Sequence, residues 1–472
     1  MEGMRGADAY FLREQSRDRH MHTLKIVVVD PSTAREKLSF ERVRERAARA
    51  MPHLAAFRCR PVRTPFGIGT PVWLDAPQIN PDYHFRHEIL PAGAQEGAGD
   101  EALDELVGRI ASEPLDERRP LWQVYFVEGL PEGRVAYVTK IHHAVADGTA
   151  SAELVARTFQ TTPDPMPLLP PPTEANETVP ADWRLLAGSL RRELVRQRDL
   201  PDLLRRSARA IGTGLRSRRE GLPGPPAAFA GPMTRFNLPL TPNRIFRHVT
   251  LPLQEMKRVK GVFGGTLNDV FLTLVGGAIH RYLADQRQLP GVPATAAIPV
   301  SVRRDDEDPS FGNAIATWFA STGSHLSDPV ARLRSVRQST AAARELFAAR
   351  DARLSVDWLD YWPLRWLYLD AFPRAVTSLL RRPTFTVIAS NVKGPRQPLY
   401  IDGSRVVALL SMGPLALQQG LNFTAWSYVD DFAVGLHACR EHVPDLARLA
   451  EGMQQELDAL IAAAHSRESR AS

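Results

Sequence analysis

Hydrophobic residues follow two kinds of spacing along this chain, and both kinds occur in its first and its last third. Short runs rich in β-branched and aromatic residues are typical of buried strands, whereas apolar residues three or four apart are typical of helices. These patterns predict strands at 24–29, 121–127, 135–141, 295–302, 384–388, 421–428 and 431–436, and helices at 34–50, 149–159, 267–283 and 443–464. Two mixed α/β regions in succession fit a fold of two similar lobes, although no sequence repeat relates them.

The composition changes between these two regions. Residues 161–180 contain seven prolines, three of them consecutive, so this segment cannot form a regular helix and is predicted to be an extended linker. The segment 184–219 is rich in arginine with leucines interspersed, which favours amphipathic helix interrupted at Pro201. We therefore divide the chain into an N-terminal lobe (1–160), a linker with a basic helical segment (161–240) and a C-terminal lobe (241–472).

The basic segment 184–219 has two competing interpretations. Arginine-rich amphipathic helices lie in anionic membrane interfaces, with leucines among the acyl chains and cations at the headgroups. The alternative is a solvated surface helix that packs on its own domain. Nucleic-acid binding is not expected, because no recognisable nucleic-acid module or interleaved aromatic pattern accompanies the charge.

Composition sets the remaining bounds. The 472 residues are 44% hydrophobic and 24% charged, which is ordinary for a soluble globular protein. Two cysteines, Cys59 and Cys439, suggest a reduced cytosolic setting and no disulfide scaffold. The N-terminus has no run of signal-peptide type, and no stretch approaches 18 uninterrupted apolar residues, so no transmembrane helix is expected. A net charge of +6 suits an anionic lipid surface or an acyl-CoA but predicts neither by itself.

The motif with the clearest chemistry is His142-His143-Ala144-Val145-Ala146-Asp147-Gly148, which follows a predicted strand and precedes a predicted helix. Imidazole titrates near neutrality and a carboxylate can fix its tautomer, so the motif suits a general base. Adjacent histidines on a strand point to opposite faces, so at most one faces a given cavity. The competing interpretations are two ordinary histidines beside an Asp-Gly turn, and a zinc site that lacks further ligands at suitable spacing.

Six further blocks place this motif in context. They are Pro120-Leu121-Trp122, Asn268-Asp269, 299–303 (PVSVR), 311–313 (FGN), 390–395 (SNVKGP) and 421–428, with 8–12 and 21–22 at the start and 439–445 near the end. HHxxxDG is the signature of acyltransferases resembling chloramphenicol acetyltransferase and peptide-synthetase condensation domains. The ordered blocks resemble one branch, the bacterial wax ester synthase/diacylglycerol acyltransferases, over nearly the whole chain. The resemblance implies a mixed α/β fold of two chloramphenicol-acetyltransferase-like lobes, with the active site in a channel between them.

The resemblance also implies a reaction. A fatty acyl group would pass from acyl-CoA, a substrate, to diacylglycerol or a long-chain alcohol, with no cofactor and no metal. His143 would be the base, and His142 would support the loop or line the pocket. Asp147 would hold the loop by pairing with a distant arginine, for which Arg303 and Arg58 are both candidates. Gly148 would serve a backbone conformation or a close approach at the helix start.

Other blocks supply candidate binding residues. Asn268 is the candidate donor to the developing oxyanion, and its alternative role is an N-cap. Asp269 would position Asn268 or favour the helix N-terminus. Pro120, Leu121 and Trp122 would shape the acyl or coenzyme pocket, with plain core packing as the alternative. Ser390 and Asn391 would help to form the substrate channel, where a turn at a strand end is the alternative.

Two other functions compete with this one: a related acyltransferase with a different acceptor or a carrier-bound donor, and a non-catalytic lipid-body protein. The expected location is cytoplasmic, and peripheral at the inner membrane or at a lipid-inclusion surface through 184–219. Acceptor preference and acyl chain length depend on pocket shape, which short motifs do not report.

Overall fold

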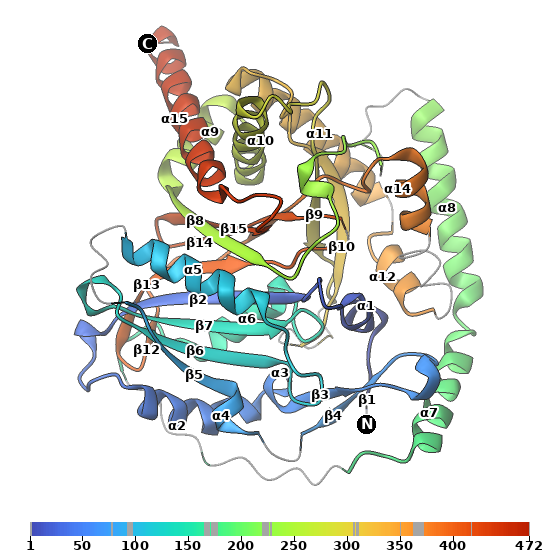
Figure 1. The fold of residues 1–472 in the computed structure, drawn as a ribbon. Coiled ribbons are helices and arrows are strands. Elements are labelled where there is room, and N and C mark those ends of the chain that lie inside the picture. The colour runs from blue at the N-terminus through green and yellow to red at the C-terminus, as the bar shows by residue number, and fades with distance from the viewer. Residues whose placement is uncertain are drawn as a thin grey trace.

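The structure is a computed structural model that carries side chains. It describes residues 2–76, 79–91, 98–164, 170, 178–219, 226, 229–304, 307, 311–349, 351–361, 372–416 and 418–471. Two six-stranded sheets form its centre, one mostly from each half of the chain (Figure 1). A three-stranded sheet of β1 (Glu2–Gly3), β4 (Val72–Asp75) and β3 (Cys59–Val62) lies beside the first of them.

The N-terminal sheet has the order β12-β13-β2-β7-β6-β5. Its strands are β12 (Tyr400–Ile401), β13 (Ser404–Met412), β2 (His22–Asp30), β7 (Val135–His142), β6 (Trp122–Glu128) and β5 (Phe85–Ile89). Side chains of β2 alternate between two cores: Leu24 and Ile26 pack with α5 (Ala98–Ser112), while Val27 and Val29 pack with α2 (Phe40–Ala50). The apolar run in β2 is therefore buried on both faces.

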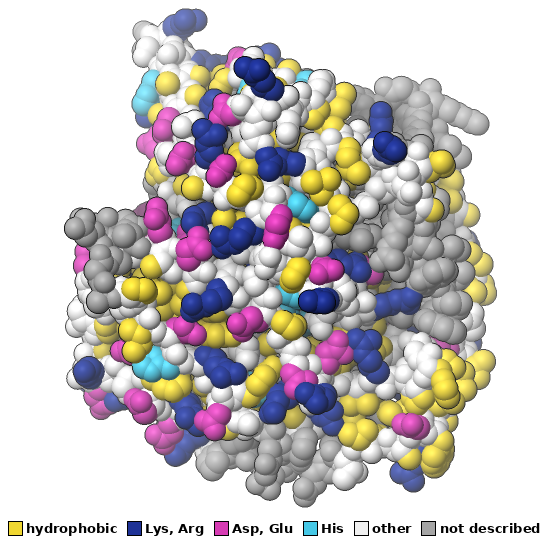
Figure 2. Space-filling model, viewed as in Figure 1, with side chains coloured by type: hydrophobic (Ala, Val, Ile, Leu, Met, Phe, Trp, Pro, Cys, Tyr) yellow, Lys and Arg dark blue, Asp and Glu magenta, His cyan; other side chains and the backbone are white. Residues whose placement is uncertain are grey.

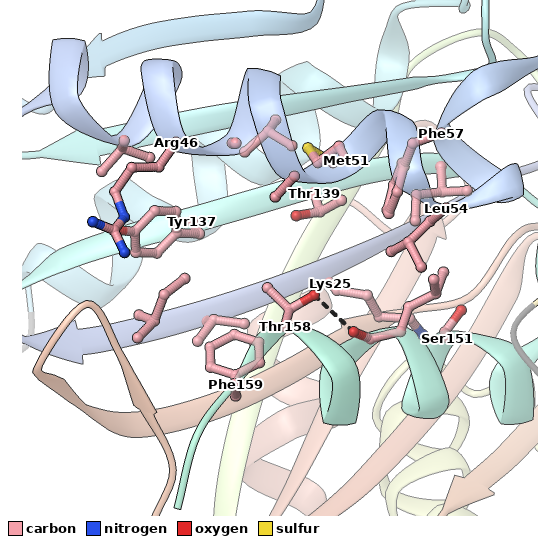
Figure 3. A pocket seen from close by; sticks show the side chains of 18 of the residues that line it. Lys25, Arg46, Met51, Leu54, Phe57, Tyr137, Thr139, Ser151, Thr158 and Phe159 are labelled. Atoms are coloured by element: carbon pink, nitrogen blue, oxygen red, sulfur yellow. Dashed lines mark hydrogen bonds between the residues drawn. The ribbon is translucent and has the colours of Figure 1, made fainter. Parts of the chain in front are cut away.

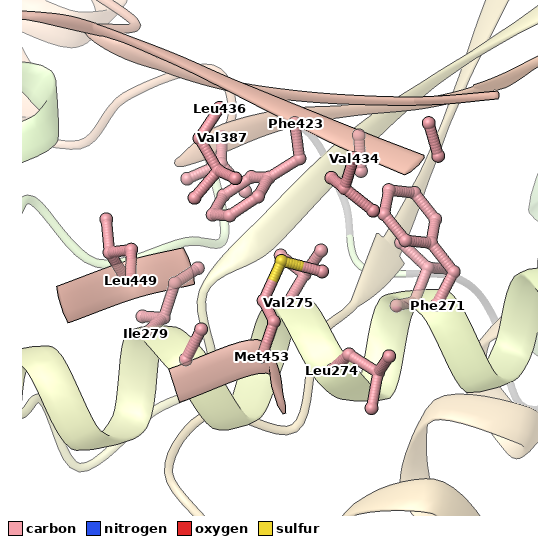
Figure 4. Close-up of a cluster of buried hydrophobic side chains, with 14 of the residues drawn as sticks. Phe271, Leu274, Val275, Ile279, Val387, Phe423, Val434, Leu436, Leu449 and Met453 are labelled. Carbon is pink, nitrogen blue, oxygen red and sulfur yellow. The ribbon is translucent and has the colours of Figure 1, made fainter. Parts of the chain in front are cut away.

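The C-terminal sheet has the order β10-β9-β11-β14-β15-β8. Its strands are β10 (Ile315–Ser321), β9 (Thr295–Ser301), β11 (Val387–Val392), β14 (Leu421–Tyr428), β15 (Asp431–Cys439) and β8 (Arg244–Pro252). Helices α9 (Leu253–Phe263), α10 (Leu267–Asp285), α11 (Pro329–Ala349) and α15 (Leu446–Ala471) cover one face. Figure 4 shows the core that results, in which Phe271 and Val275 of α10 and Met453 of α15 face Phe423 and Val434 of the sheet.

The remaining helices are shorter or lie at the periphery. They are α1 (Gly6–Glu14), α3 (Ala55–Arg58), α4 (Pro81–His84), α6 (Gly148–Thr158), α7 (Asp182–Arg196), α8 (Leu200–Arg219), α12 (Leu354–Leu359) and α14 (Phe372–Leu380). The 3₁₀ turns are η1 (Pro31–Thr33), η2 (Met51–His53), η3 (Pro65–Gly67), η4 (Pro131–Gly133) and η5 (Arg235–Asn237). The basic segment is thus helical, as α7 and α8, and Pro201 stands in the first turn of α8, where it needs no backbone donor.

Three predicted boundaries were wrong. The helix predicted at 34–50 begins at Phe40, because η1 occupies 31–33 and Ser39 caps the helix by accepting from the Arg42 amide. The strand predicted at 384–388 is Val387–Val392, so it includes the polar residues that follow the apolar run. The closing helix starts at Leu446 and continues to Ala471. Parts of the proline-rich linker, 165–169 and 171–177, lie outside the described residues.

The most consequential departure concerns β13. This strand belongs to the C-terminal half of the sequence but pairs antiparallel with β2 from Leu24 to Asp30, inside the N-terminal sheet. The N-terminal sheet therefore contains a strand from beyond residue 241. The division of the chain into domains at 160 and 241 remains a prediction. Strand exchange of this kind is invisible to local patterns, because hydrophobic periodicity reports burial and not the neighbour.

Candidate active site

A cavity of about 790 Å³ lies where the two halves of the chain meet, and His143 is part of its wall. The N-terminal half contributes Phe11, Lys25 and Gly148, and the C-terminal half contributes Asn268 and Ser390 among others. A cavity of this size, mostly apolar with a few convergent polar groups, has the ordinary form of a small-molecule site. The motif at the end of β7 therefore opens into a space that both halves build.

The imidazole of His143 is oriented by Asn313. Its Nδ1 lies 3.0 Å from Asn313 Oδ1. The Asn313 amide nitrogen donates to the His143 carbonyl (2.7 Å) and to Asp8 Oδ1 (2.9 Å), which fixes which end of the amide faces the ring. Because Oδ1 can only accept, the neutral His143 carries its proton on Nδ1. The lone pair of Nε2 is then left to accept a proton.

The surroundings of His143 keep it neutral near pH 7. Burial lowers its pKa, and the Lys25 cation acts in the same direction, whereas Asp147 and the hydrogen bond to Asn313 act against it. The ring of Phe11 stacks on the imidazole with centroids 4.2 Å apart. A neutral imidazole held flat in this way is in the state that a general base requires.

Asp147 is buried and fully hydrogen-bonded. Its Oδ1 accepts from the Ala150 amide (2.8 Å) at the start of α6, and its Oδ2 accepts from Arg303 Nη2 (2.9 Å) and from the Ala314 amide (3.0 Å). The carboxylate therefore ties the loop after β7 both to the following helix and to the C-terminal half.

Arg303 extends this link. Its Nη1 donates to the Phe311 carbonyl (3.0 Å) and its Nη2 to the Gly312 carbonyl (2.8 Å), directly before Asn313. One guanidinium thus fixes both the carboxylate of the motif and the segment that orients the imidazole. Its fixed fork of donors suits such a multiple contact.

Of the two arginines considered as partners of Asp147, Arg58 is engaged elsewhere. Its Nε lies 2.9 Å from Asp75 Oδ1, and its Nη1 donates to the Pro52 carbonyl. The choice between the two falls on Arg303.

His142 points away from the cavity, as alternation on a strand requires. It is fully buried, and its Nδ1 accepts from the Ala144 amide at 3.0 Å. Burial, and then the proximity of His143, lower its pKa to about 3, so it stays uncharged. Its backbone amide donates to the Leu121 carbonyl. These contacts give it a place in the loop and not in the cavity wall.

Pro120, Leu121 and Trp122 lie in the core, so their expected place in a substrate pocket is not where the structure puts them. The Trp122 indole donates to the Phe57 carbonyl (2.8 Å) and stacks on His84 with centroids 4.1 Å apart. The lining of the cavity at His143 does not include them. They contact the site through one backbone hydrogen bond, from the His142 amide to the Leu121 carbonyl.

Gly148 allows a close approach between elements. A Cβ at this position would lie 3.3 Å from Val392 Cγ2, tighter than most real contacts, and the residue itself lines the cavity. Its side-chain hydrogen therefore lets the start of α6 come up against β11.

Asn268 and Asp269 lie at the start of α10. Thr266 is the N-cap, and it forms a capping box with Asp269, so the alternative of Asn268 as N-cap was wrong. Asp269 also accepts from Thr340 Oγ1 at 2.6 Å. Both residues line the cavity whose wall includes His143.

Ser390 and Asn391 line the cavity from the opposite wall. They are part of β11 and pair in parallel with Thr424 and Ala425 of β14, so they are not a turn after a strand. Their polar side chains follow the apolar run because the strand passes from the core to the cavity.

Sequence reasoning missed three residues of this site. Asn313 and Asp8 belong to blocks that the sequence analysis noted without giving them a role, and Lys25 was counted only as part of a strand. The signal for Lys25 was a lysine in an otherwise apolar strand, since lysine is almost never fully buried without a partner. Among the described residues, no three His, Cys, Asp or Glu side chains group as a metal site would need.

Solved structures show the fold class. A wax ester synthase/diacylglycerol acyltransferase from Marinobacter aquaeolei VT8 has a TM-score of 0.73 at 23% identity, with 98% of this chain and 100% of that chain covered. The starter condensation domain of rhizomide synthetase has a TM-score of 0.55 at 12% identity, with 98% and 94% covered. Both likenesses show the same fold class, a two-lobed mixed α/β arrangement.

Family models narrow the class. The wax ester synthase/diacylglycerol acyltransferase catalytic domain matches residues 4–271, and the C-terminal domain of the same family matches residues 311–461. The chain belongs to the wax ester synthase/diacylglycerol acyltransferase family and is an acyltransferase, as its motifs predicted.

Relatives align with this chain over nearly their whole length. Two Mycobacterium tuberculosis proteins, each named "Putative diacyglycerol O-acyltransferase", are 32% identical over 465 residues (96% of this chain, 94% of the relative) and 33% identical over 477 residues (99% and 98%). One from Mycobacterium bovis is 29% identical over 470 residues (97% and 98%).

Proposed function

We propose that this protein transfers a long-chain fatty acyl group from acyl-CoA to the hydroxyl of diacylglycerol, of a long-chain alcohol, or of both. The observation that carries the proposal is the bond from His143 Nδ1 to Asn313, which leaves Nε2 as the base inside a cavity built by both halves. The relatives named as putative diacylglycerol O-acyltransferases support diacylglycerol as an acceptor.

The reaction needs one base and no cofactor. Nε2 of His143 takes the proton of the acceptor hydroxyl as its oxygen attacks the thioester carbonyl, and an O–C bond forms. The tetrahedral intermediate carries its charge on the former carbonyl oxygen, where the Asn268 amide is the proposed donor. Collapse breaks the C–S bond, and the proton on Nε2 goes to the departing sulfur, releasing the ester and free coenzyme A.

The direct test supplies purified protein with palmitoyl-CoA and either diacylglycerol or hexadecanol. Thiol release that depends on the acceptor, with the ester as product, is expected for wild type and lost in His143→Ala. His142→Ala serves as the matched control and retains more activity, because His142 does not face the cavity. If wild type releases no thiol with either acceptor, the proposal is overturned. Equal activity of wild type and His143→Ala would overturn the role of His143.

We also propose attachment to an anionic lipid surface through α7 and α8. The inner face of this pair packs on the protein through Leu185 and Leu203, each 2% exposed. Its outer face exposes large apolar side chains instead: Trp183 (66%), Leu190 (46%), Leu194 (71%), Val195 (50%), Leu204 (52%) and Ile211 (64%). Figure 2 shows hydrophobic side chains along the edge that these helices form. The buried inner face supports the interpretation of helices packed on their own domain, and the exposed apolar face supports the proposed contact with lipid.

Phe66 belongs to the same edge. It lies in η3, which contacts α7, is 91% exposed, and has a φ of 58°. A bulky residue in this strained conformation, with its ring in solvent, suits insertion among lipids. Among the described residues no single helix is long and apolar enough to cross a bilayer. Helices α9 and α10 reach the necessary length and hydropathy only together, as a pair bent by 102°.

Sedimentation with vesicles tests the attachment. Wild type is expected to sediment with vesicles containing phosphatidylglycerol and less with pure phosphatidylcholine, because arginines contribute about 1 kcal/mol each near an anionic surface. The double variant Leu190→Ser/Leu194→Ser should lose this binding, while Val292→Ser, at an exposed valine elsewhere, should keep it. Equal sedimentation of all three would contradict the proposal.

A further inference from the structure

A second cavity of about 280 Å³ lies between α2 and α6, beside the first (Figure 3). Its wall is largely apolar, with Val43, Ala47 and Ala50 from α2 and Leu154 from α6. The reaction proposed above uses none of these residues. Protein interiors are otherwise close-packed, so packing alone does not explain an apolar cavity of this size.

The two cavities share one wall. Alternate residues at 21, 23 and 25 line the first cavity, and residues 25 and 27 of the same face of β2 line the second. On β7 the residues at 137, 139 and 141 line the second cavity, and His143, the next position in this alternation, lines the first. One face of the N-terminal sheet therefore leads from the imidazole into the apolar cavity.

Lys25 stands at the junction, because it alone among the described lining residues belongs to both cavities. Its side chain is 6% exposed, Nζ donates to Ser411 Oγ at 2.7 Å, and Nζ lies 5.1 Å from the centre of the Trp426 ring. In Figure 3 it lies near Ser151, while Arg46 and Tyr137 gather at the other end. The ion pair of Arg46 with Asp402 (2.8 Å) ends the apolar run there.

We propose that the second cavity binds the hydrocarbon end of the acyl chain, and that Lys25 is a specificity-determining residue which sets how readily a long chain passes into it. The inference rests on the proposed function in that the chain belongs to the acyl donor. When the thioester carbonyl lies beside His143, its acyl chain can extend along the shared face of β2 and β7 into the second cavity.

The chemistry of the substrates selects this occupant. Coenzyme A carries several phosphates, which a largely aliphatic cavity would leave unsatisfied, because its cations Lys25 and Arg46 already bond Ser411 and Asp402. Diacylglycerol has two chains and needs the larger space. A single unbranched chain is the component that a narrow cavity of about 280 Å³ accommodates.

Equilibrium binding of saturated acyl-CoAs from octanoyl to stearoyl, without acceptor, tests the cavity. For wild type, affinity should rise with chain length by about fourfold per buried methylene until the cavity is filled. Ala47→Leu and Ala47→Phe should stop this rise at progressively shorter chains, because both side chains occupy the cavity. Glu45→Phe, on the exposed side of α2, should match wild type.

The outcomes separate this inference from the proposed function. If Ala47→Phe, shown to be folded by its thermal unfolding, keeps the wild-type dependence on chain length, the cavity does not hold the chain. If the dependence shifts as expected while no acceptor gives thiol release, the cavity assignment stands and the proposed reaction fails. Ala47→Leu covers the case in which the larger phenylalanine does not fold.

Lys25 is tested by replacement at constant length. Lys25→Met removes the amine, so stearoyl-CoA should bind several-fold tighter relative to octanoyl-CoA than it does to wild type. Lys25→Arg keeps a cation at the junction and should leave this ratio at or below the wild-type value. An unchanged ratio in Lys25→Met would overturn the role of Lys25, and a raised ratio in Lys25→Arg would do the same.

Discussion

At the scale of single residues, the chemistry depends on which nitrogen of His143 carries the proton. Asn313 decides this, because its amide is held by the His143 carbonyl and by Asp8 and can only offer an oxygen to Nδ1. Burial raises the pKa of Asp8 to about 7, and its contacts with Asn313 oppose that rise. The ring is thus hydrogen-bonded by an amide, while burial and the charges of Asp147 and Lys25 also act on its pKa.

Asn313→Ala should lower kcat by roughly a hundredfold or more, since correct positioning of a general base is worth at least this much. The KM for acyl-CoA should change much less, because Asn313 orients the imidazole and does not bind the chain. Steady-state kinetics with a fixed acceptor measure both. An equal loss in kcat and in binding would indicate general damage to the site instead.

The pH dependence follows from the lowered pKa of His143. Activity needs the neutral imidazole, so kcat/KM should be lost only as the pH falls below the ordinary histidine value of about 6.5. Lys25→Met removes a cation that disfavours the imidazolium, so it should move this acid limb to higher pH. Rates from pH 5 to 8 on a short-chain acyl-CoA test the shift, and a limb that moves to lower pH would contradict it.

At the scale of elements, the loop after β7 is held by a buried ion pair from the other half of the chain. The side chains of Asp147 and Arg303 are only 1% and 6% exposed. Breaking a buried pair by removing one partner costs about 3–5 kcal/mol, because the remaining charge stays desolvated.

Arg303→Met should therefore lower the free energy of unfolding by about 3–5 kcal/mol, measured by urea denaturation. Arg58→Met is the matched control: its pair with Asp75 is about a third exposed on each side, so its loss should cost at most about 1 kcal/mol. The double variant Asp147→Asn/Arg303→Met should lose less than the two single losses added together. Equal costs for Arg303→Met and Arg58→Met would contradict the structural role of the pair.

At the scale of the whole molecule, the two halves of the chain complete each other. The C-terminal half supplies β13 to the N-terminal sheet, Arg303 to Asp147 and Asn313 to His143. Without it, β2 would present an open edge and Asp147 an unpaired buried charge.

Residues 1–240 expressed alone should consequently fail to give a cooperative thermal transition, although they contain the whole HHxxxDG motif. Co-expression with residues 241–472 should restore a folded complex with acyltransferase activity, read out by thiol release. A stable, monomeric fragment 1–240 with normal melting would show that β13 is dispensable.

Most elements of the core were predictable, because their burial repeats at short range. The strands at 24–29, 121–127, 135–141 and 421–428 and the helix at 267–283 coincide with observed elements within a few residues. Two of the misplaced boundaries, at Phe40 and Val387, lie where local capping and a passage from core to cavity override the apolar pattern.

The sequence by itself determined the family and the α/β class, since both depend on local order along the chain. Alternation along one strand also predicted that at most one of His142 and His143 faces a given cavity, and the family resemblance implied that this one is His143. Only the tertiary structure decided that Arg303 pairs with Asp147, that Asn313 fixes the imidazole 170 positions away, and that Lys25 joins two cavities. Those contacts join segments far apart in the chain, and periodicity reports whether a residue is buried but not what it is buried against.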